Sequence, residues 1–446
     1  MNQTIRIKKG LDVPLGDEVQ RTIVDARTIE RYAVKPTDMV GFTPRLLVGD
    51  GDTVAAGQPL MADKNDPRIT LPSPVDGVVE AIIRGEKRKL MEVVVNSEFG
   101  KLNYEKADAS DSEFNIRNSK LEESPCWWML RERPFGTIAN PDHKPKGIYV
   151  SLRDTNPLAP DIDFTLKGRE HEFEAGVKAL EAFAEVHCVR AEGPHPAGNI
   201  GTIVAALDPI NKGECIWHVG AQDVANIGRW CLTGEYRPER VIAVGGPAAK
   251  APKYYRVLCG ACLKRINEVQ LTDPGYPQLP TADHPLPTRI ISGSVLSGTA
   301  IAADGFLGMY DQQVTLIEEG DQYDFMGWLM PGLKKFSFSK TFLSGFVRLL
   351  PTTHYPLPTE FNTNLHGGRR PFLFTGNFER VFPFDIYPLQ LIKACIVGDV
   401  ELQEKLGIYE VEPEDFALCE FIDPSKTEIQ TIIREALEVL RKEAIA

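Results

Sequence analysis

Short apolar runs alternate with amphipathic helical patterns between Gly147 and Pro247. The runs typical of buried strands are Ile148–Leu152, Val186–Arg190, Cys215–Val219 and Val241–Gly245. Apolar residues at helical spacing lie between them, most clearly Phe173, Val177, Leu180 and Ala184. Strands that alternate with helices predict a mostly parallel sheet covered on both faces, which is a Rossmann-like architecture.

A turn rich in glycine and proline joins the second of these strands to a predicted helix, and it reads E-G-P-H-P-A-G-N-I-G-T at Glu192–Thr202. Such a turn holds backbone N–H groups at a helix N-terminus, where they suit an anion or a polar ligand edge. Gly193 and Gly198 have the spacing of a phosphate loop, but Asn199 stands where that motif requires lysine. The fingerprint G-x-G-x-x-G is absent as well, so the turn predicts an α/β domain without binding of ATP, GTP or NAD.

His195 is the candidate side chain of this turn. Pro194 and Pro196 stiffen the backbone around it and define the position of the imidazole. One interpretation is a hydrogen-bond donor to a ligand carbonyl or a proton relay, because histidine titrates near neutral pH. The other is that His195 bonds a neighbouring loop and fixes the turn. The second is favoured, because no carboxylate or nucleophile accompanies His195 in the sequence.

The segment Pro44–Ile83 alternates short β-rich runs with Gly, Asp and Asn turns. Its pattern G-D-x-V-x-x-G-Q-x-L, followed by S-P-x-x-G-V-V, resembles a flattened barrel of the biotinyl/lipoyl type. Lys64 lies near the hairpin tip where carrier domains of that kind attach their cofactor. The stretch Lys64–Pro72 is long for a carrier hairpin, however, so a purely structural barrel is the favoured interpretation.

The regions on either side of the alternating segment are less regular. Lys101–Asn118 is polar and charged, which suits a linker. Cys126–Asn140 places two tryptophans beside Arg131 and Arg133. Such a stretch can stack on a ligand, but a seam between domains is the favoured interpretation. Further along, β-branched runs between residues 253 and 331 predict a small mixed β domain.

The C-terminal part changes from irregular to helical. Gly332–Pro383 is rich in aromatic, proline and basic residues with little periodicity, which is typical of a functional or interface region. Its candidate partner contacts are Lys334, Lys335 and Arg348. From Tyr387 onward the spacing is helical, with Asp399 placed to cap one helix and Ser425 and Glu428 at the spacing of a capping box.

Composition narrows the classes of function. The 446 residues are 43% hydrophobic and 25% charged, which is typical of several globular domains. The net charge of −12 disfavours broad contact with nucleic acid. No apolar run reaches the roughly 18–20 residues that cross a bilayer, and the N-terminus has no secretory pattern. The eight scattered cysteines indicate reduced thiols. Cys259 and Cys262 have metal-like spacing without two further ligands, so two buried thiols are the favoured interpretation.

Distinctive motifs follow one another along essentially the whole chain. They are I-K-K-G-L-D at Ile7–Asp12, D-T-N-P-L-A at Asp154–Ala159, G-P-H-P-A-G at Gly193–Gly198, S-G-S-V-L-S-G at Ser292–Gly298, M-P-G at Met330–Gly332, G-N-F-E-R-V at Gly376–Val381 and L-I-K-A-C-I-V-G-D at Leu391–Asp399. Together they resemble the NqrA family, whose members are one of the subunits of the Na⁺-translocating NADH:quinone reductase.

The resemblance implies a multidomain protein of α/β and β classes with a C-terminal helical domain. The implied parts are an N-terminal segment and biotinyl/lipoyl-like barrel at 1–100, a Rossmann-like α/β domain at 101–252, a β-grasp domain of the soluble-ligand-binding (SLBB) type at 253–331, an extended interface region at 332–383 and a C-terminal helical domain at 384–446.

The resemblance also implies a role in a complex that reduces ubiquinone or another quinone with NADH and exports Na⁺. The chain is expected at the cytoplasmic face of the bacterial inner membrane, held there by partner subunits. Related subunits of the Rnf complex and of respiratory complex I bind FMN through a Gly-rich loop and an iron–sulfur cluster through closely spaced cysteines. This sequence has neither pattern, and a [4Fe–4S] cluster needs about four thiolates.

Two interpretations of the chain's role follow. In the first it is a cofactor-free structural subunit without catalytic or metal-ligating residues, and flavins, iron–sulfur clusters and quinone act through other subunits. It would then line the quinone side, with Gly193, His195, Gly198 and Asn199 as candidate ligand residues. In the second it is a self-contained FMN-binding NADH oxidoreductase subunit.

Overall fold

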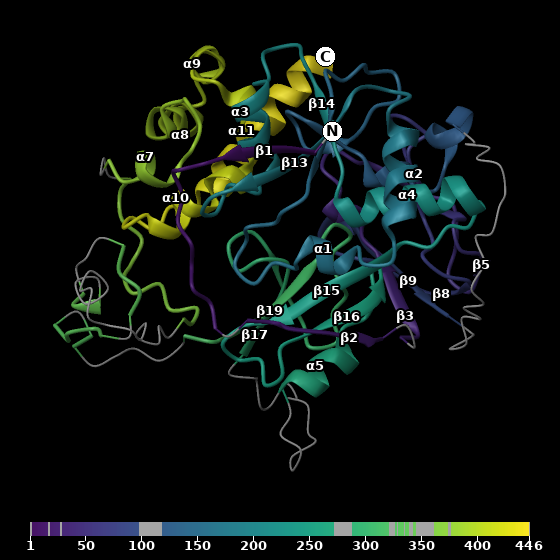
Figure 1. The fold of residues 1–446 in the computed structure, drawn as a ribbon, viewed down its shortest axis with the longest axis horizontal. Coiled ribbons are helices and arrows are strands. Elements are labelled where there is room, and N and C mark those ends of the chain that lie inside the picture. Colours follow the sequence, from purple (N-terminus) through teal and green to yellow (C-terminus); the bar gives the residue numbers. More distant parts are fainter. Residues whose placement is uncertain are drawn as a thin grey trace.

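The structure is a computed structural model that describes most of the chain. The described residues are 2–16, 18–26, 29–97, 118–271, 288–320, 326–327, 329–333, 335–338, 342–344, 361–372 and 376–445. Figure 1 shows a sandwich of small sheets at one side, two larger sheets in the middle and a group of helices from the C-terminal part at the other side.

The N-terminal sandwich consists of two small antiparallel sheets. One has the order β3 (Arg31–Val34), β9 (Leu90–Asn96), β8 (Gly77–Arg84), β5 (Thr53–Val54), and the other has the order β4 (Pro44–Leu46), β6 (Pro59–Asp63), β7 (Thr70–Pro72). Three consecutive valines of β9, Val93, Val94 and Val95, are all buried in the core. The exposed Lys64 follows β6, and the Asp63 carboxylate accepts hydrogen bonds from the Thr43 and Asn65 N–H groups.

A six-stranded sheet carries the alternating pattern of the sequence. Its order is β1 (Asn2–Arg6), β13 (Val186–Glu192), β12 (Ile148–Ser151), β14 (Ile216–His218), β10 (Arg131–Arg133), β11 (Thr137–Ile138). The first four strands are parallel, whereas β10 and β11 add an antiparallel edge. Strand β1 precedes the sandwich in the sequence, yet it completes a sheet whose other strands follow more than a hundred residues later.

Helices cover both faces of this sheet, as the alternation predicts. On one face, α2 (Glu170–Leu180) and α4 (Ala221–Thr233) share a core with Ile148 and Val150. On the other face, α3 (Ile200–Leu207) packs with Tyr149. Glycines bring α2 and α4 close together, because a Cβ at Gly228 would lie 1.7 Å from the Glu172 carbonyl oxygen. The short α1 (Ile162–Thr165) follows β12.

A second six-stranded sheet is mixed. Its order is β18 (Thr299–Ile301), β17 (Thr288–Ser292), β19 (Gln313–Glu318), β15 (Glu239–Gly245), β16 (Lys253–Leu258), β2 (Gln20–Asp25), with α5 (Lys264–Leu271) after β16. The sequence pattern grouped Val241–Gly245 with the strands of the first sheet, and this assignment is wrong. Strand β15 pairs with β16 and β19, and β10 occupies the place beside β14. Periodicity identifies a buried strand but not its partner.

Trp127 and Trp128 fill the seam between the two large sheets, which confirms the favoured interpretation of that stretch. The predicted linker before it lies outside the described residues, apart from Asn118. Trp127 contacts Trp217 of the first sheet at 5.5 Å between ring centroids. Trp128 contacts Tyr310, which precedes β19 of the second sheet, at 5.6 Å. Both indoles are buried, and their N–H groups donate to the Ala139 carbonyl and the Tyr236 hydroxyl.

The C-terminal helices form a separate apolar core. They are α7 (Phe378–Val381), α8 (Pro388–Val397), α9 (Val400–Lys405), α10 (Ala417–Ile422) and α11 (Ile429–Ile445). Asp399 caps α9 by accepting from the Leu402 N–H, as predicted. The predicted capping box of Ser425 and Glu428 is wrong, because Asp423 accepts the N–H groups of Ser425 and Thr427 instead.

Short 3₁₀ helices accompany these strands and helices. They are Pro36–Asp38, Glu86–Arg88, Asn118–Glu123, Trp127–Met129, Ile408–Glu410 and Pro413–Phe416, the last of which is labelled η6 here. The described parts of 332–383 pack on the C-terminal helices, since Phe336 contacts the Phe421 ring at 5.3 Å and the Arg370 N–H donates to the Ser425 carbonyl.

Candidate functional site

The candidate site lies at the carboxyl ends of the parallel strands of the first sheet. The chain runs from β12 outward to β13 and then returns to the other side of β12 to form β14. The crevice between the ends of β12 and β14 is therefore a topological switch point, which is where open α/β sheets bind ligands. Helices α3 and α4 begin here, and neither N-terminus has a side-chain cap.

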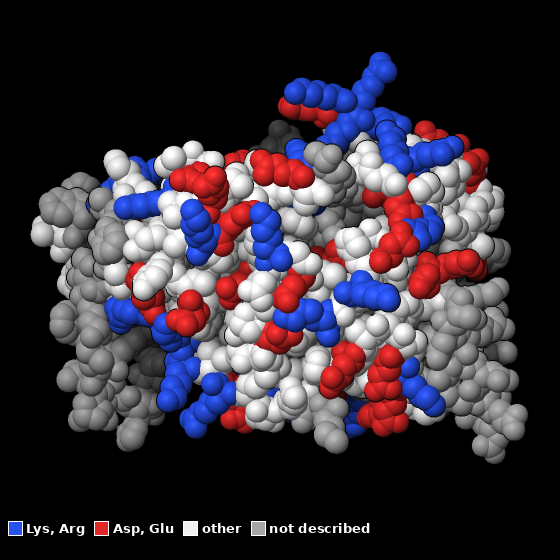
Figure 2. Space-filling view, turned by 90° about the horizontal axis from the view of Figure 1, so that it is seen from above, with Lys and Arg blue, Asp and Glu red and all other residues white. Residues whose placement is uncertain are grey.

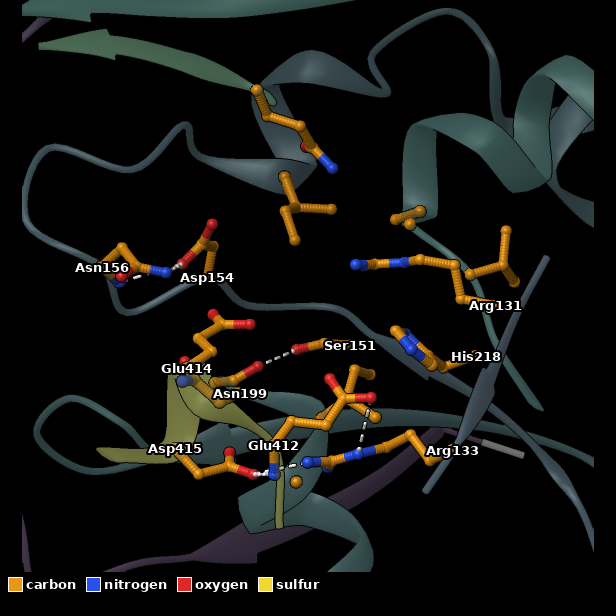
Figure 3. Close-up of a pocket in the computed structure, with 18 residues that line it drawn as sticks. Arg131, Arg133, Ser151, Asp154, Asn156, Asn199, His218, Glu412, Glu414 and Asp415 are labelled. Atoms are coloured by element: carbon orange, nitrogen blue, oxygen red, sulfur yellow. Dashed lines mark hydrogen bonds and ion pairs between the residues drawn. The ribbon is translucent and has the colours of Figure 1, made fainter. Parts of the chain in front are cut away.

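A cavity of about 120 Å³ fills this position. Its lining combines the two helix starts, strand β10 and the acidic turn η6 of the C-terminal part (Figure 3). The lining residues are Arg131, Arg133, Ser151, Asp154, Asn156, Ile162, Gly198, Asn199, Ile200, Gly201, His218, Val219, Gly220, Ala221, Gln312, Glu412, Glu414 and Asp415. We call this the switch-point pocket.

Two of the four residues predicted for a ligand site line this pocket. The Gly198 N–H donates to the Thr155 hydroxyl at 2.9 Å, and its carbonyl accepts from the Ser151 hydroxyl at 2.8 Å. A side chain at Gly198 would collide with the Arg153 carbonyl oxygen at 2.2 Å. Asn199 precedes α3, is 5% exposed, and its Nδ2 has no hydrogen-bond partner. An unpaired buried amide donor is costly, so Asn199 is suited to a ligand acceptor.

The other two predicted residues, Gly193 and His195, are absent from the lining and instead hold the N-terminal segment. The backbone of Gly193 has φ 137°, and a Cβ there would lie 2.2 Å from the Ile7 carbonyl oxygen. The His195 N–H donates to the Asp12 carboxylate, and its carbonyl accepts from the Leu11 N–H. His195 is 1% exposed, and burial lowers its pKa to about 4. Its imidazole is therefore neutral near pH 7.

Arg133 connects the pocket wall to the C-terminal part. Its Nη2 lies 2.5 Å from Oδ2 of Asp415, and its Nε lies 3.5 Å from Oε1 of Glu412. Glu412 and Asp415 also form a capping box, in which each side chain accepts the other's backbone N–H. Figure 3 shows both carboxylates beside the Arg133 guanidinium, and a Cβ at Gly201, in the first turn of α3, would lie 2.3 Å from Oδ1 of Asp415. The chain thus places its own carboxylates near two positive helix ends.

Carboxyl groups outnumber guanidinium groups in the lining, since Asp154, Glu412, Glu414 and Asp415 face only Arg131 and Arg133. Burial, followed by the charge of Asp415, raises the pKa of Glu414 to about 7. Burial also raises the pKa of Asp154, although the Asn156 backbone and side-chain amides donate to its carboxylate. Glu414 can therefore exchange a proton near neutral pH.

The remaining wall holds a neutral imidazole beside a cation. His218 is 3% exposed, and its Nε2 has no hydrogen-bond partner. Burial, together with the charges of Arg131 and Arg133, holds the pKa of His218 well below its ordinary value. The Arg131 guanidinium lies 4.5 Å from the Tyr310 ring centroid, and in Figure 3 it extends across the pocket. The pocket can thus hydrogen-bond a polar ligand through Arg131, Asn199 and His218.

The lining shows no activated nucleophile. Ser151 is the hydroxyl of the pocket, and it donates to the carbonyls of Arg153 and Gly198. No base therefore takes its proton. The arrangement favours binding and proton exchange over covalent chemistry.

Most of the charged lining was not predicted from the sequence. Asp154 and Asn156 come shortly after the predicted strand Ile148–Leu152, and His218 lies near the end of the predicted strand Cys215–Val219. Their position at the carboxyl edge of a parallel sheet was therefore available as a signal. The acidic turn offered no such signal, because Glu412, Glu414 and Asp415 reach the pocket from a different part of the chain.

Other sequence candidates lie away from the pocket. Lys334 and Arg348 are outside the described residues, whereas Lys335 lies over the Phe342 ring at 5.3 Å from its centroid. Cys259 and Cys262 are buried free thiols, as expected. None of the described helices is both long and apolar enough to span a bilayer.

Comparisons with known proteins agree with this architecture. A family model described as the NqrA N-terminal barrel-sandwich hybrid domain matches residues 5–98. Another, described as the NqrA second alpha/beta domain, matches residues 115–191 and 180–236. The barrel-sandwich lies in the first matched part, and the strands of the α/β sheet other than β1 lie in the second.

Relatives of full length are similar along the whole chain. The NqrA subunit of the Na⁺-translocating NADH-quinone reductase from Rhodopirellula baltica is 35% identical over 465 residues, covering 98% of each chain. The proteins of the same name from Haemophilus influenzae and Yersinia pseudotuberculosis are also 35% identical, covering 98% of this chain and 100% of theirs. A solved NAD⁺-reducing [NiFe]-hydrogenase covers 68% of this chain and 55% of its own at 11% identity, and its TM-score of 0.31 supports no inference. The chain belongs to the NqrA family of Na⁺-translocating NADH-quinone reductase subunits.

Proposed function

We propose that this chain is the NqrA subunit of a complex that reduces quinone with NADH and couples the reaction to Na⁺ transport. The observation that carries the proposal is the match to full-length relatives of that name over 98% of this chain. The finer fold assignments belong to the same proposal: a Rossmann-like second domain and a β-grasp domain of the SLBB type around the second sheet.

The chain acts in this complex without a redox centre of its own. Two properties of the switch-point pocket support this role. Its volume of about 120 Å³ is below the roughly 300–1,000 Å³ of pockets that enclose drug-sized ligands, a class that includes a flavin nucleotide. Its acidic groups, Glu412, Glu414 and Asp415, also repel a phosphate at the helix N-termini that would otherwise bind one. Flavins, iron–sulfur clusters and electron transfer are then the work of other subunits.

The alternative role, a self-contained FMN-binding NADH oxidoreductase, has a direct test. The full chain is purified and its visible absorption is recorded after denaturation and release of any bound flavin. The proposal expects less than a tenth of an equivalent of flavin. Flavin near one equivalent, held in the chain and lost in a Gly198→Val variant, would establish the alternative.

The pocket is suited to the head group of a quinone. Its volume of about 120 Å³ is close to the roughly 150 Å³ engineered cavity that accepts benzene. Asn199 has an unpartnered donor, Nδ2, and His218 has an unpartnered Nε2. Both atoms are able to bond a quinone carbonyl. The chain thus lines the quinone side of the complex through these two residues.

A photoreactive quinone analogue tests this assignment in the assembled complex. Labelled peptides of this chain are expected to fall at least tenfold in an Asn199→Leu variant, which fills the pocket and removes the amide. The matched control is Asn211→Leu, which changes an asparagine of the loop before β14 outside the pocket lining. Equal labelling of both variants would show that quinone does not use the pocket.

The place of the chain in the complex is peripheral, at the cytoplasmic face of the bacterial inner membrane. Its partners are the other subunits, not nucleic acid. The absence of nucleic acid from these partners agrees with Figure 2, in which basic and acidic side chains intermingle on the described surface of the face shown, without a continuous basic stripe. Charge reversal of Lys334, Lys335 and Arg348 together is expected to reduce co-purification with partner subunits. Normal assembly of that triple variant would show that the segment 332–383 does not contact the partner subunits through these three residues.

A further inference from the structure

Three side chains with metal-ligating atoms converge behind the switch-point pocket. Strand β10 turns Arg131 and Arg133 toward the pocket, so Glu132 between them points to the opposite face of the sheet. Glu132 pairs with Trp217 of β14. Cys215 precedes Trp217 by two residues, so its side chain lies on the same face of the sheet as that of Trp217. His143 reaches the same place from the loop after β11, and its Nδ1 lies 2.8 Å from Oε1 of Glu132.

The donor atoms of these three residues are close enough for one ion. A carboxylate oxygen of Glu132, a ring nitrogen of His143 and Cys215 Sγ all lie within 4.8 Å of one another. Ligands bound at about 2.0–2.3 Å in a tetrahedral arrangement are separated by roughly 3.3–3.8 Å. A shift of about 1 Å by the loop that carries the partly exposed His143 would bring donor atoms that lie within 4.8 Å of one another to this tetrahedral separation.

Surrounding groups already contact two of the three ligands, Glu132 and Cys215. The Trp217 indole N–H donates to Oε2 of Glu132 at 3.0 Å, which directs Oε1 toward His143. Cys215 Sγ lies 3.7 Å from the carbonyl oxygen of Lys144, the residue after His143. Such supporting contacts are what fix ligand geometry in metal sites. Glu132 itself is 6% exposed, so its charge gains from a counter-charge at this place.

We propose that Glu132, His143 and Cys215 bind one divalent transition-metal ion of the zinc class. A set of carboxylate oxygen, imidazole nitrogen and thiolate sulfur matches the ligands of zinc, with water in the fourth position. The thiol proton leaves to solvent as sulfur binds the ion. The carboxylate and the thiolate then balance the charge of the ion.

The site has a structural consequence for the pocket. The ion ties the His143 loop to β10 and β14, whose other face carries Arg131, Arg133 and His218. Metal binding therefore stiffens the wall of the switch-point pocket and stabilises the folded chain. This inference is independent of the proposed function, because neither the ion nor its test involves quinone or NADH.

Cobalt(II) is the probe for the test, since a cobalt–thiolate bond gives a charge-transfer band in the near ultraviolet. The full chain without an affinity tag is stripped with a chelator and titrated with Co²⁺, and bound cobalt is then displaced by Zn²⁺. We expect saturation at one equivalent with the thiolate band. In His143→Ala, which changes a half-exposed side chain, the affinity should fall about tenfold or more. In Cys215→Ser the band should be lost.

Matched controls separate this site from adventitious binding. Cys395→Ser changes another partly exposed thiol, and His171→Ala changes an exposed histidine of α2. Both should bind as the unchanged chain does. Lack of saturable binding in the unchanged chain, a thiolate band that persists in Cys215→Ser, or unaltered affinity in His143→Ala would each overturn the proposal.

Discussion

Removal of the Arg133 guanidinium tests how the C-terminal helices are held to the α/β sheet. The Arg133 and Asp415 side chains are each 2% exposed and 2.5 Å apart, and Glu412 is 11% exposed. Arg133→Met keeps most of the side-chain volume but leaves two buried carboxylates without their cation. Loss of one partner of a buried ion pair costs about 3–5 kcal/mol. At about 2–4 °C per kcal/mol for domains of 150–250 residues, Tm should fall by roughly 6–20 °C.

Thermal unfolding of the full chain, followed by circular dichroism, measures this shift. Arg21→Met is the control, since Arg21 and Asp161 form a 2.6 Å pair whose side chains are 71% and 31% exposed. Exposed pairs contribute about 0–1 kcal/mol, so this control should lose less than about 4 °C. Adding Asp415→Asn to Arg133→Met should restore part of the stability by removing an unpaired charge. Equal shifts in the two arginine variants, or further loss in the double variant, would refute the electrostatic explanation.

Three further predictions concern Glu414, Gly193 and Lys64. The pKa of Glu414 rises from 4.5 to about 7 in the fold. The folded chain therefore holds the Glu414 proton more tightly than the unfolded chain, and the stability that this supplies is present below about pH 4.5 and lost as the pH rises through 7. Glu414→Gln should therefore raise the free energy of unfolding at pH 8 by roughly 1–3 kcal/mol and leave it unchanged at pH 4.5; a pH-independent effect in denaturant titrations would contradict this. Gly193→Ala should lower the free energy of unfolding by more than about 2 kcal/mol, because the new Cβ would lie 2.2 Å from the Ile7 carbonyl oxygen. Gly168→Ala should lower it by about 1–2 kcal/mol, because Gly168 has a positive φ of 81° but open space around it. Equal losses in the two variants would exclude the clash. Intact mass spectrometry of chain produced in cells supplied with lipoate and biotin should show an unmodified Lys64; an added cofactor mass would show that the barrel is a carrier.

Periodicity and turn chemistry predicted the elements of this fold but not all of their partners. The alternation after Gly147 predicted a parallel sheet with helices on both faces, and the structure confirms it for β12, β13 and β14. The strand at Val241–Gly245 was grouped with them wrongly, because a buried strand carries the same apolar pattern in either sheet. Strands β1 and β2 enter different sheets, a pairing that no local pattern records.

The candidate site divides in the same way. Gly198 and Asn199 were predicted, because a turn from strand to helix at the carboxyl edge of a sheet presents backbone N–H groups whatever surrounds it. His195 was weighed for a ligand role, yet its backbone bonds the segment at Leu11 and Asp12, which is distant in the sequence. The acidic side of the pocket comes from η6 and depends on how the C-terminal helices dock.

The sequence by itself determined the family, the strands and helices, and the loop that begins α3, because these depend on residue order and local backbone chemistry. Only the tertiary structure decided which charges meet. Arg133 and Asp415 are 282 residues apart, and their carboxylate–guanidinium contact needs a buried, low-dielectric place that exists only after two parts of the chain pack together. Glu132, His143 and Cys215 converge for the same reason, since strand pairing sets both their spacing and the face they share.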